Sequence, residues 1–149
     1  MTDYTELSSS LTAISQEVRY NISILSNASA LIWDALPDLN WCGFYLMQDG
    51  KLILGPFQGK IACTEIELGK GVCGTAAIND RTVLVKDVHT FDGHIACDSA
   101  SNSEIVVPVH KDGKLYGVLD IDSPSLARFT EEDKVGLEMT VAALEGVLK

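Results

Sequence analysis

Hydrophobic positions in the N-terminal quarter recur at steps of three or four residues or multiples of them, the spacing of one face of an α-helix. These positions are Leu7, Leu11, Ile14, Val18, Ile22, Leu25, Ile32 and Leu36. Asn27 falls inside this stripe and is a favourable N-cap residue, so the pattern predicts two helices, at about 4–24 and 28–36. Pro37 ends the second helix.

Shorter apolar runs bounded by turn residues follow, and they predict strands. Asp49-Gly50 and Asp112-Gly113 each separate two such runs, and Asp-Gly is a strong signal for a tight hairpin. The hairpin strands are expected at about 41–48 and 51–56, and at about 105–109 and 115–121. Two further short strands are expected at 61–65, which carries Cys63, and at 82–85.

The remaining segments complete the predicted order of elements. A glycine-rich turn at 69–74 opens a short helix, and the polar stretch 87–103 has no clear period, which predicts a long and functional loop. Thr130 and Asp133 resemble a capping box that starts the last helix. This order predicts an α+β fold, a central antiparallel sheet with the N- and C-terminal helices packed on one face. At 149 residues, we expect a single domain over 1–149.

Composition narrows the compartment and the partners. The formal charge is −10 and the basic residues are scattered singly, so nucleic acid and anionic membranes are poor partner candidates. No apolar run approaches the roughly 20 residues of a membrane span. The acidic N-terminus lacks the basic and apolar regions of a signal peptide. A cytoplasmic protein is therefore expected.

In that compartment, four cysteines do not predict a disulfide framework. Cys63 and Cys73 have C-x9-C spacing, without the close cysteine or histidine pairs of zinc sites, and we expect no metal. Cys97 is the leading candidate nucleophile, because it lies in the polar loop between His94 and Asp98, where a buried structural role is less natural.

Each of the other cysteines allows two interpretations. Cys73 lies near a predicted helix N-terminus, where backbone N–H groups and the helix dipole favour a thiolate, or it is a small core residue under the turn. Cys63 is either a core residue of its strand or a spare thiol that resolves an oxidised cysteine. For Cys42, core packing is favoured.

Three acids and two aromatic residues are candidates for the rest of a site. Glu104 stands at a strand start. If it is buried its pKa would rise, and the neutral acid could donate a proton; the alternative is an exposed side chain. Asp120 and Asp122 share one face of a strand end, where they could bind an ammonium group or a positive sulfur centre, or form a solvated edge. Trp41 and Tyr45 share a face as well, as an aromatic wall for a methyl group or cation, or as core.

Five runs of the chain contain five of these candidates, Cys73, Cys97, Glu104, Asp120 and Asp122. The runs are Gly69-Lys70-Gly71-Val72-Cys73-Gly74, Val85-Lys86-Asp87-Val88, Gly93-His94-Ile95-Ala96-Cys97-Asp98, Ser103-Glu104-Ile105-Val106-Val107-Pro108 and Leu119-Asp120-Ile121-Asp122-Ser123. With the region 40–129 around them, these runs resemble the free methionine-(R)-sulfoxide reductase family. The resemblance implies the GAF fold and three functional cysteines, here Cys63, Cys73 and Cys97, with Cys42 outside the pattern.

The resemblance also implies a reaction. Free L-methionine (R)-sulfoxide would be reduced to L-methionine through a Cys97 sulfenic acid and an intramolecular disulfide, which thioredoxin would reduce, with no metal or organic cofactor. GAF relatives often dimerise, so a homodimer is expected. The alternatives are a non-catalytic GAF module that senses a small ligand, and a thiol peroxidase.

Overall fold

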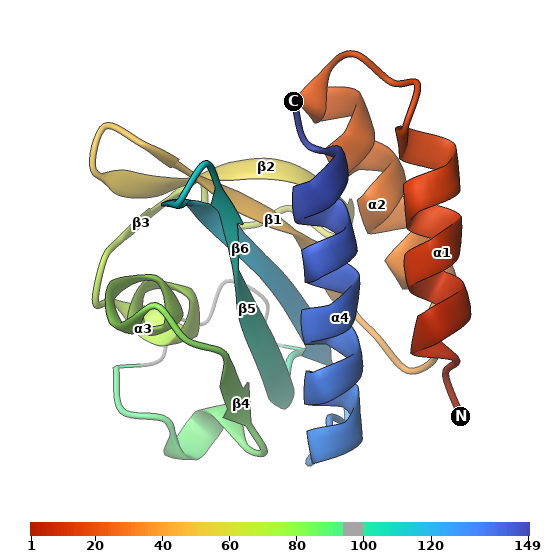
Figure 1. The fold of residues 1–149 in the computed structure, drawn as a ribbon. Coiled ribbons are helices and arrows are strands. Elements are labelled where there is room, and N and C mark those ends of the chain that lie inside the picture. The colour runs from red at the N-terminus through yellow and green to blue at the C-terminus, as the bar shows by residue number, and fades with distance from the viewer. Residues whose placement is uncertain (94–99) are drawn as a thin grey trace.

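The computed structural model describes residues 1–93 and 100–149, and these residues form a six-stranded antiparallel sheet in the order β3-β2-β1-β6-β5-β4 (Figure 1). The strands are β1 (Trp41–Gln48), β2 (Lys51–Gly59), β3 (Glu65–Glu67), β4 (Val83–Val85), β5 (Ser103–Lys111) and β6 (Lys114–Ser123). The helices are α1 (Tyr4–Ser15), α2 (Asn21–Ala35), α3 (Gly71–Asn79), the short 3₁₀ helix η1 (Val88–Thr90) and α4 (Glu131–Val147). Among these described helices, none has both the length and the apolar character needed to cross a bilayer.

The two faces of the sheet carry different helices (Figure 1). Helices α1, α2 and α4 lie on one side of the sheet, where Leu11, Ile24 and Leu137 belong to one apolar cluster with Phe44 and Ile121 of the sheet. Helix α3 packs on the other face, against a second apolar cluster that includes Trp41, Tyr45, Val106 and Val118. The predicted α+β class and the packing of the terminal helices on one face are confirmed. The second face, under α3, is the face that carries the candidate site.

The predicted break between the first two helices is wrong. It was expected at Asn27, but α1 ends at Ser15 and α2 begins at Asn21. Asn27 is exposed inside α2, and the neighbouring Ser26 hydroxyl donates a hydrogen bond to the Ile22 carbonyl at 2.7 Å. Continuing the helix through Asn27 buries Leu25 and Ala28 together. Core packing therefore outweighs the capping preference of Asn27.

Both predicted hairpins are confirmed, whereas the strand that was expected to carry Cys63 is displaced. Asp49-Gly50 and Asp112-Gly113 have the positive φ angles of tight hairpin turns. Strand β2 runs past its expected end to Gly59, and Pro56 is tolerated because β3 pairs with β2 only over 51–53. The next strand therefore starts at Glu65, and Cys63 lies in the connection between β2 and β3.

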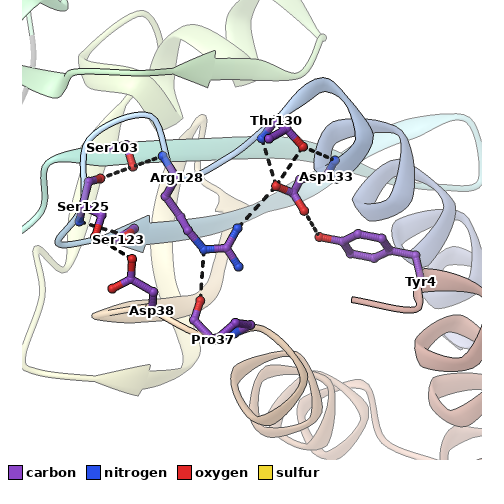
Figure 2. Close-up of polar contacts among 9 residues, drawn as sticks. All are labelled: Tyr4, Pro37, Asp38, Ser103, Ser123, Ser125, Arg128, Thr130 and Asp133. Carbon is purple, nitrogen blue, oxygen red and sulfur yellow. Dashed lines mark hydrogen bonds and ion pairs between the residues drawn. The ribbon is translucent and has the colours of Figure 1, made fainter. Parts of the chain in front are cut away.

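A polar network joins the start of α4 to the start of α1 and to Pro37, which follows α2 (Figure 2). Thr130 and Asp133 form the predicted capping box, with Asp in the position of Glu. Asp133 also accepts a hydrogen bond from the Tyr4 hydroxyl at 2.7 Å and pairs with Arg128 at 3.3 Å. Arg128 in turn donates to the Pro37 carbonyl at 3.0 Å. Burial would raise the pKa of Asp133, but hydrogen bonds from Thr130 and Tyr4 and the charge of Arg128 lower it below its usual value.

Removing the Tyr4 hydroxyl tests this network. Tyr4→Phe should lower the free energy of unfolding at pH 7 by about 1–2 kcal/mol, because a hydrogen bond to a carboxylate is lost while the ring keeps its packing over Gly136. A group whose pKa is lowered by folding stabilises the fold above its unfolded pKa, and that contribution disappears as pH falls through the folded value. The difference between Tyr4→Phe and wild type, measured by urea denaturation, should therefore shrink in acid. Tyr20→Phe, at an exposed tyrosine, is the matched control and should change little.

Candidate active site

A cavity of about 50 Å³ lies between α3 and the sheet face beneath it. Six predicted site residues line it, namely Trp41, Tyr45, Cys73, Glu104, Asp120 and Asp122. They come from β1, α3, β5 and β6, so segments distant in sequence meet in one place. The remaining lining residues in the described part of the chain are Ile61, Ala62, Ile66, Lys70, Gly71, Val72 and Ser101.

Strand register explains why the three acids gather. Glu104 on β5 lies directly opposite Asp122 on β6, and Asp122 is also opposite Trp41 on β1. Asp120 is two residues from Asp122 and therefore projects from the same face. Glu104, Asp120 and Asp122 are all buried, with at most 8% of each residue exposed. The two interpretations that left these acids exposed, a strand-start side chain and a solvated edge, are therefore wrong.

Burial of the acids sets their protonation. Loss of hydration is the main reason why the pKa of Glu104 lies well above its usual value, and the negative charges of Asp120 and Asp122 raise it further. Burial also raises the pKa of Asp120, although hydrogen bonding to Glu104 and Cys73 opposes that shift. Burial and the neighbouring charges thus favour the protonated form of Glu104, which is the form that could donate a proton inside the cavity.

Cys73 lies in the first turn of α3, as expected, but its electrostatics differ from the prediction. The helix N-terminus was expected to favour a thiolate. Instead, burial first, and then the charges of Asp120 and Glu104, raise the pKa of the Cys73 thiol well above its usual value. Two carboxyl groups beside a dehydrated thiol outweigh the partial positive charge of a short helix. Cys73 is therefore a buried protonated thiol that faces the site.

Close backbone contact fixes the position of Cys73. Its neighbour Gly74 packs so tightly against the end of β3 that an added Cβ would lie 2.4 Å from the Glu67 carbonyl oxygen. The Gly69 N–H also donates to the Gly74 carbonyl at 2.8 Å. The glycine-rich run thus lets the turn close under α3, and it holds Cys73 toward the carboxyl groups.

The aromatic wall is formed by Trp41 and Tyr45, whose stacked rings have centroids 5.8 Å apart. Both are buried, so they belong to the core and line the cavity at the same time. Their polar ends support the segment between β2 and β3. The Tyr45 hydroxyl donates to the Cys63 carbonyl at 2.9 Å, and Trp41 Nε1 donates to the Lys60 carbonyl at 3.1 Å.

Two of the other cysteines, Cys42 and Cys63, lie among the described residues and have different surroundings. Cys42 is a fully buried free thiol among the residues under α1, α2 and α4, which agrees with core packing. Cys63 is half-buried, next to the cavity-lining Ala62, and it is disulfide-bonded. The prediction for Cys97 falls outside the described residues.

Comparisons of sequence and structure identify relatives of this chain. A model of the GAF domain family matches residues 10–148. The free methionine-R-sulfoxide reductase of Escherichia coli (strain K12) is 52% identical over 145 residues, which cover 97% of this chain and 88% of that protein. The chain belongs to the GAF-domain family of free methionine-R-sulfoxide reductases. Both the expected family and the GAF-like fold are therefore confirmed.

Solved structures of this reductase family have the same fold. The fRMsr of Staphylococcus aureus in complex with substrate has a TM-score of 0.95 and 52% identity, covering 100% of this chain and 97% of that chain. The free methionine-R-sulfoxide reductase of Neisseria meningitidis in complex with its substrate has a TM-score of 0.92 and 41% identity, covering 96% of this chain and 86% of that chain.

Several residues near the cavity were not predicted from the sequence. Ser101 lines the cavity and accepts a hydrogen bond from Asn40 Nδ2 at 3.0 Å. Lys70 lines it beside the start of α3. Ser103 Oγ, next to Glu104, donates to the Ser125 carbonyl at 2.6 Å and accepts from the Arg128 N–H, which anchors the start of β5 (Figure 2). Isolated polar residues such as these have no recurring spacing in the sequence from which a site could be predicted.

Asn102 joins the start of the 87–103 segment to its end. The Val88 N–H donates to the Asn102 carbonyl at 2.9 Å, and Asn102 Nδ2 donates to the Pro124 carbonyl at 2.7 Å. His89 Nε2 contacts Asn102 Oδ1 at 3.0 Å. These contacts join the two ends of the segment to each other and to the end of β6.

Proposed function

We propose that the chain reduces free L-methionine (R)-sulfoxide to L-methionine in the cavity under α3. The observation that carries this proposal is a buried, protonatable Glu104 beside two further carboxyl groups and an aromatic wall. Membership of the reductase family gives the reaction, and these groups supply the acid, the charge and the apolar surface that the reaction needs. The function is assigned to residues 1–149 acting as one GAF domain.

The reaction balances with one sulfur oxidised for each sulfur reduced. Glu104 donates a proton to the sulfoxide oxygen while the Cys97 thiolate attacks the sulfur. The oxygen passes to Cys97, which becomes a sulfenic acid, and methionine leaves with its sulfur reduced by two electrons. A second thiol then attacks the sulfenic sulfur, which releases water and forms a disulfide. No metal or organic cofactor takes part.

The other lining groups select the substrate. Asp120 and Asp122 stabilise the substrate ammonium group and the positive charge that develops on the sulfur, because both carboxyl groups are buried and face the cavity. Trp41 and Tyr45 hold the S-methyl end against their stacked rings. A substrate that carries both features fits the site best.

Substrate choice provides the first test. With dithiothreitol as reductant, the protein should consume free methionine sulfoxide but hardly any N-acetyl-methionine sulfoxide, because the acetyl group removes the ammonium charge and leaves a buried carboxylate unpaired, which costs several kcal/mol, on the order of 3–5. Peroxide is the second arm. Peroxide consumption without sulfoxide reduction would favour a thiol peroxidase, and inertness toward both would favour a ligand-sensing module. Equal rates for free and acetylated sulfoxide would reject the ammonium site.

The resolving thiol is proposed to be Cys63, with a Cys63–Cys97 disulfide as the stable oxidised state and Cys73 as an intermediate or alternative resolver. Two observations support this order. Cys63 is disulfide-bonded, and the buried Cys73 thiol has a raised pKa, which makes it a poor nucleophile.

Peptide mapping tests the pairing. After one equivalent of methionine sulfoxide, digestion without reductant should yield mainly a peptide pair that joins Cys63 to Cys97. Cys73→Ser should still give this product, and Cys63→Ser should not. If the wild type yields only Cys73–Cys97, with Cys63 free, the resolver is Cys73 and the reductase reaction itself is unaffected.

Three further properties belong to this proposal. Thioredoxin reduces the disulfide and so completes the cycle, the protein works as a homodimer, and the reaction takes place in the cytoplasm. Thioredoxin is proposed because of the resemblance to the reductase family, and a low-potential dithiol protein suits a cycle that ends in a disulfide.

A further inference from the structure

Three ligand atoms of the kinds that bind transition metals meet in the cavity. Cys73 Sγ and one carboxylate oxygen each from Glu104 and Asp120 all lie within 4.8 Å of one another. All three residues are buried, with 4–6% exposed. They stand on α3, β5 and β6, so the regular elements of the fold, and not a surface loop, set their separation.

Asp120 carries a second and independent sign of a missing ligand. Its Oδ1 atom is buried and has no hydrogen-bond partner, although the residue is only 6% exposed and lines the cavity. Buried carboxylate oxygens are normally paired, because losing water without a replacement is costly. Lys70 is the one lysine or arginine among the described lining residues, and it is exposed. A compact cation inside the cavity would supply the partner that Asp120 Oδ1 lacks.

The donor set selects the ion. One thiolate and two carboxylates suit Zn²⁺, with bonds of about 2.3 Å to sulfur and 2.0–2.2 Å to oxygen. A tetrahedral ion with such bonds holds its ligands roughly 3.5 Å apart, so small side-chain rotations close the present separations. Three protein ligands leave the fourth position for water, for which a cavity of about 50 Å³ has room.

We propose that Cys73, Glu104 and Asp120 bind one Zn²⁺ ion reversibly, and that this ion inhibits the protein by occupying the place of the sulfoxide. The ion is a competitor and not a cofactor, because it would hold the acid and the carboxylate that the substrate needs. The binding itself rests on the geometry of the three ligands. Only the competition rests on the proposed reductase function.

Cobalt is the first probe, because a thiolate ligand gives Co²⁺ an intense charge-transfer band. The chain with Cys63→Ser and Cys97→Ser keeps Cys73, which is the one cysteine among the described residues that lines the cavity. Titrated with Co²⁺ without oxygen or added thiols, it should develop this band with a stoichiometry of one ion per chain, and Zn²⁺ should abolish the band. Adding Cys73→Ser should remove the band and weaken Zn²⁺ binding by more than the roughly 10–100-fold that a lost second-shell partner costs. Cys42→Ala is the matched control, and it should retain both.

The outcomes separate the two parts of the proposal. Absence of the band, or a band that persists in the Cys73→Ser background, overturns the zinc site. If Cys73→Ser fails to fold, as judged by circular dichroism, Asp120→Asn in the same background decides, because it keeps the thiol and should still weaken Zn²⁺ binding. Free methionine sulfoxide should raise the apparent Kd for Zn²⁺. Zinc binding that the sulfoxide leaves unchanged would retain the metal site and count against sulfoxide binding in this cavity.

Discussion

Replacing Cys97 with serine should abolish methionine formation completely, including the first turnover. The proposed reaction transfers the sulfoxide oxygen to this sulfur, and a hydroxyl group is a far weaker nucleophile than a thiolate at neutral pH. Of the two other cysteines assigned to the reaction, Cys73 is protonated and Cys63 is assigned to the later step. The measurement is single-turnover formation of methionine from one equivalent of sulfoxide, without added reductant.

The matched variants distinguish attack from resolution. Cys63→Ser and Cys73→Ser each retain Cys97, so each should release about one equivalent of methionine before the cycle stops or slows. A burst of wild-type size in Cys97→Ser, together with loss of the burst in either of the other two variants, would mean that the nucleophile is misassigned.

Glu104→Gln should lower the rate by about 10²–10⁴-fold and change substrate affinity much less. Glutamine keeps the shape and hydrogen-bonding reach of the protonated acid but cannot give up a proton. Steady-state kcat and KM for free methionine sulfoxide measure the two effects separately. Glu138→Gln, at a carboxylate that receives a hydrogen bond from Thr82 and does not line this cavity, is a matched control and should retain the wild-type rate.

The pH dependence gives Glu104 a signature of its own. Because burial and the nearby carboxylates raise its pKa, Glu104 should keep its proton to a higher pH than an exposed glutamate does, and the rate should fall as pH rises through that raised value. Glu104→Gln should lose this alkaline limb while any limb due to Cys97 remains. An unchanged rate at neutral pH in Glu104→Gln would reject it as the acid.

The turns and the strand faces could be predicted from sequence because their signals are local. Asp49-Gly50 and Asp112-Gly113 fix the hairpins, and alternation along β1 and β6 places Trp41, Tyr45, Asp120 and Asp122 on a common side. The helix break could not be predicted, because the burial of Leu25 and Ala28 against other elements decided it. Local signals also placed the third predicted strand at 61–65, over Cys63. In the structure, pairing with β2 sets the start of this strand, β3, at Glu65.

The electrostatics of the site were beyond the reach of sequence reasoning. The position of Cys73 at a helix start indicates a low thiol pKa, but three acids from strands 30 or more residues later in the chain surround it. The distances among Cys73, Glu104 and Asp120 depend on the register of β5 against β6 and on how closely α3 packs on them. The individual residues were therefore predictable, and their mutual influence was not.

The hydrogen bonds from Tyr45 to the Cys63 carbonyl and from Trp41 to the Lys60 carbonyl have a consequence for engineering and for divergence within the family. The wall that is proposed to select the substrate also supports the segment that carries the proposed resolving thiol. A substitution at either aromatic residue made to admit a larger sulfoxide also removes a support of Cys63. In the proposed reaction, specificity and recycling rate would thus depend on the same two side chains, and a change in substrate range should call for compensating changes in the 60–63 segment.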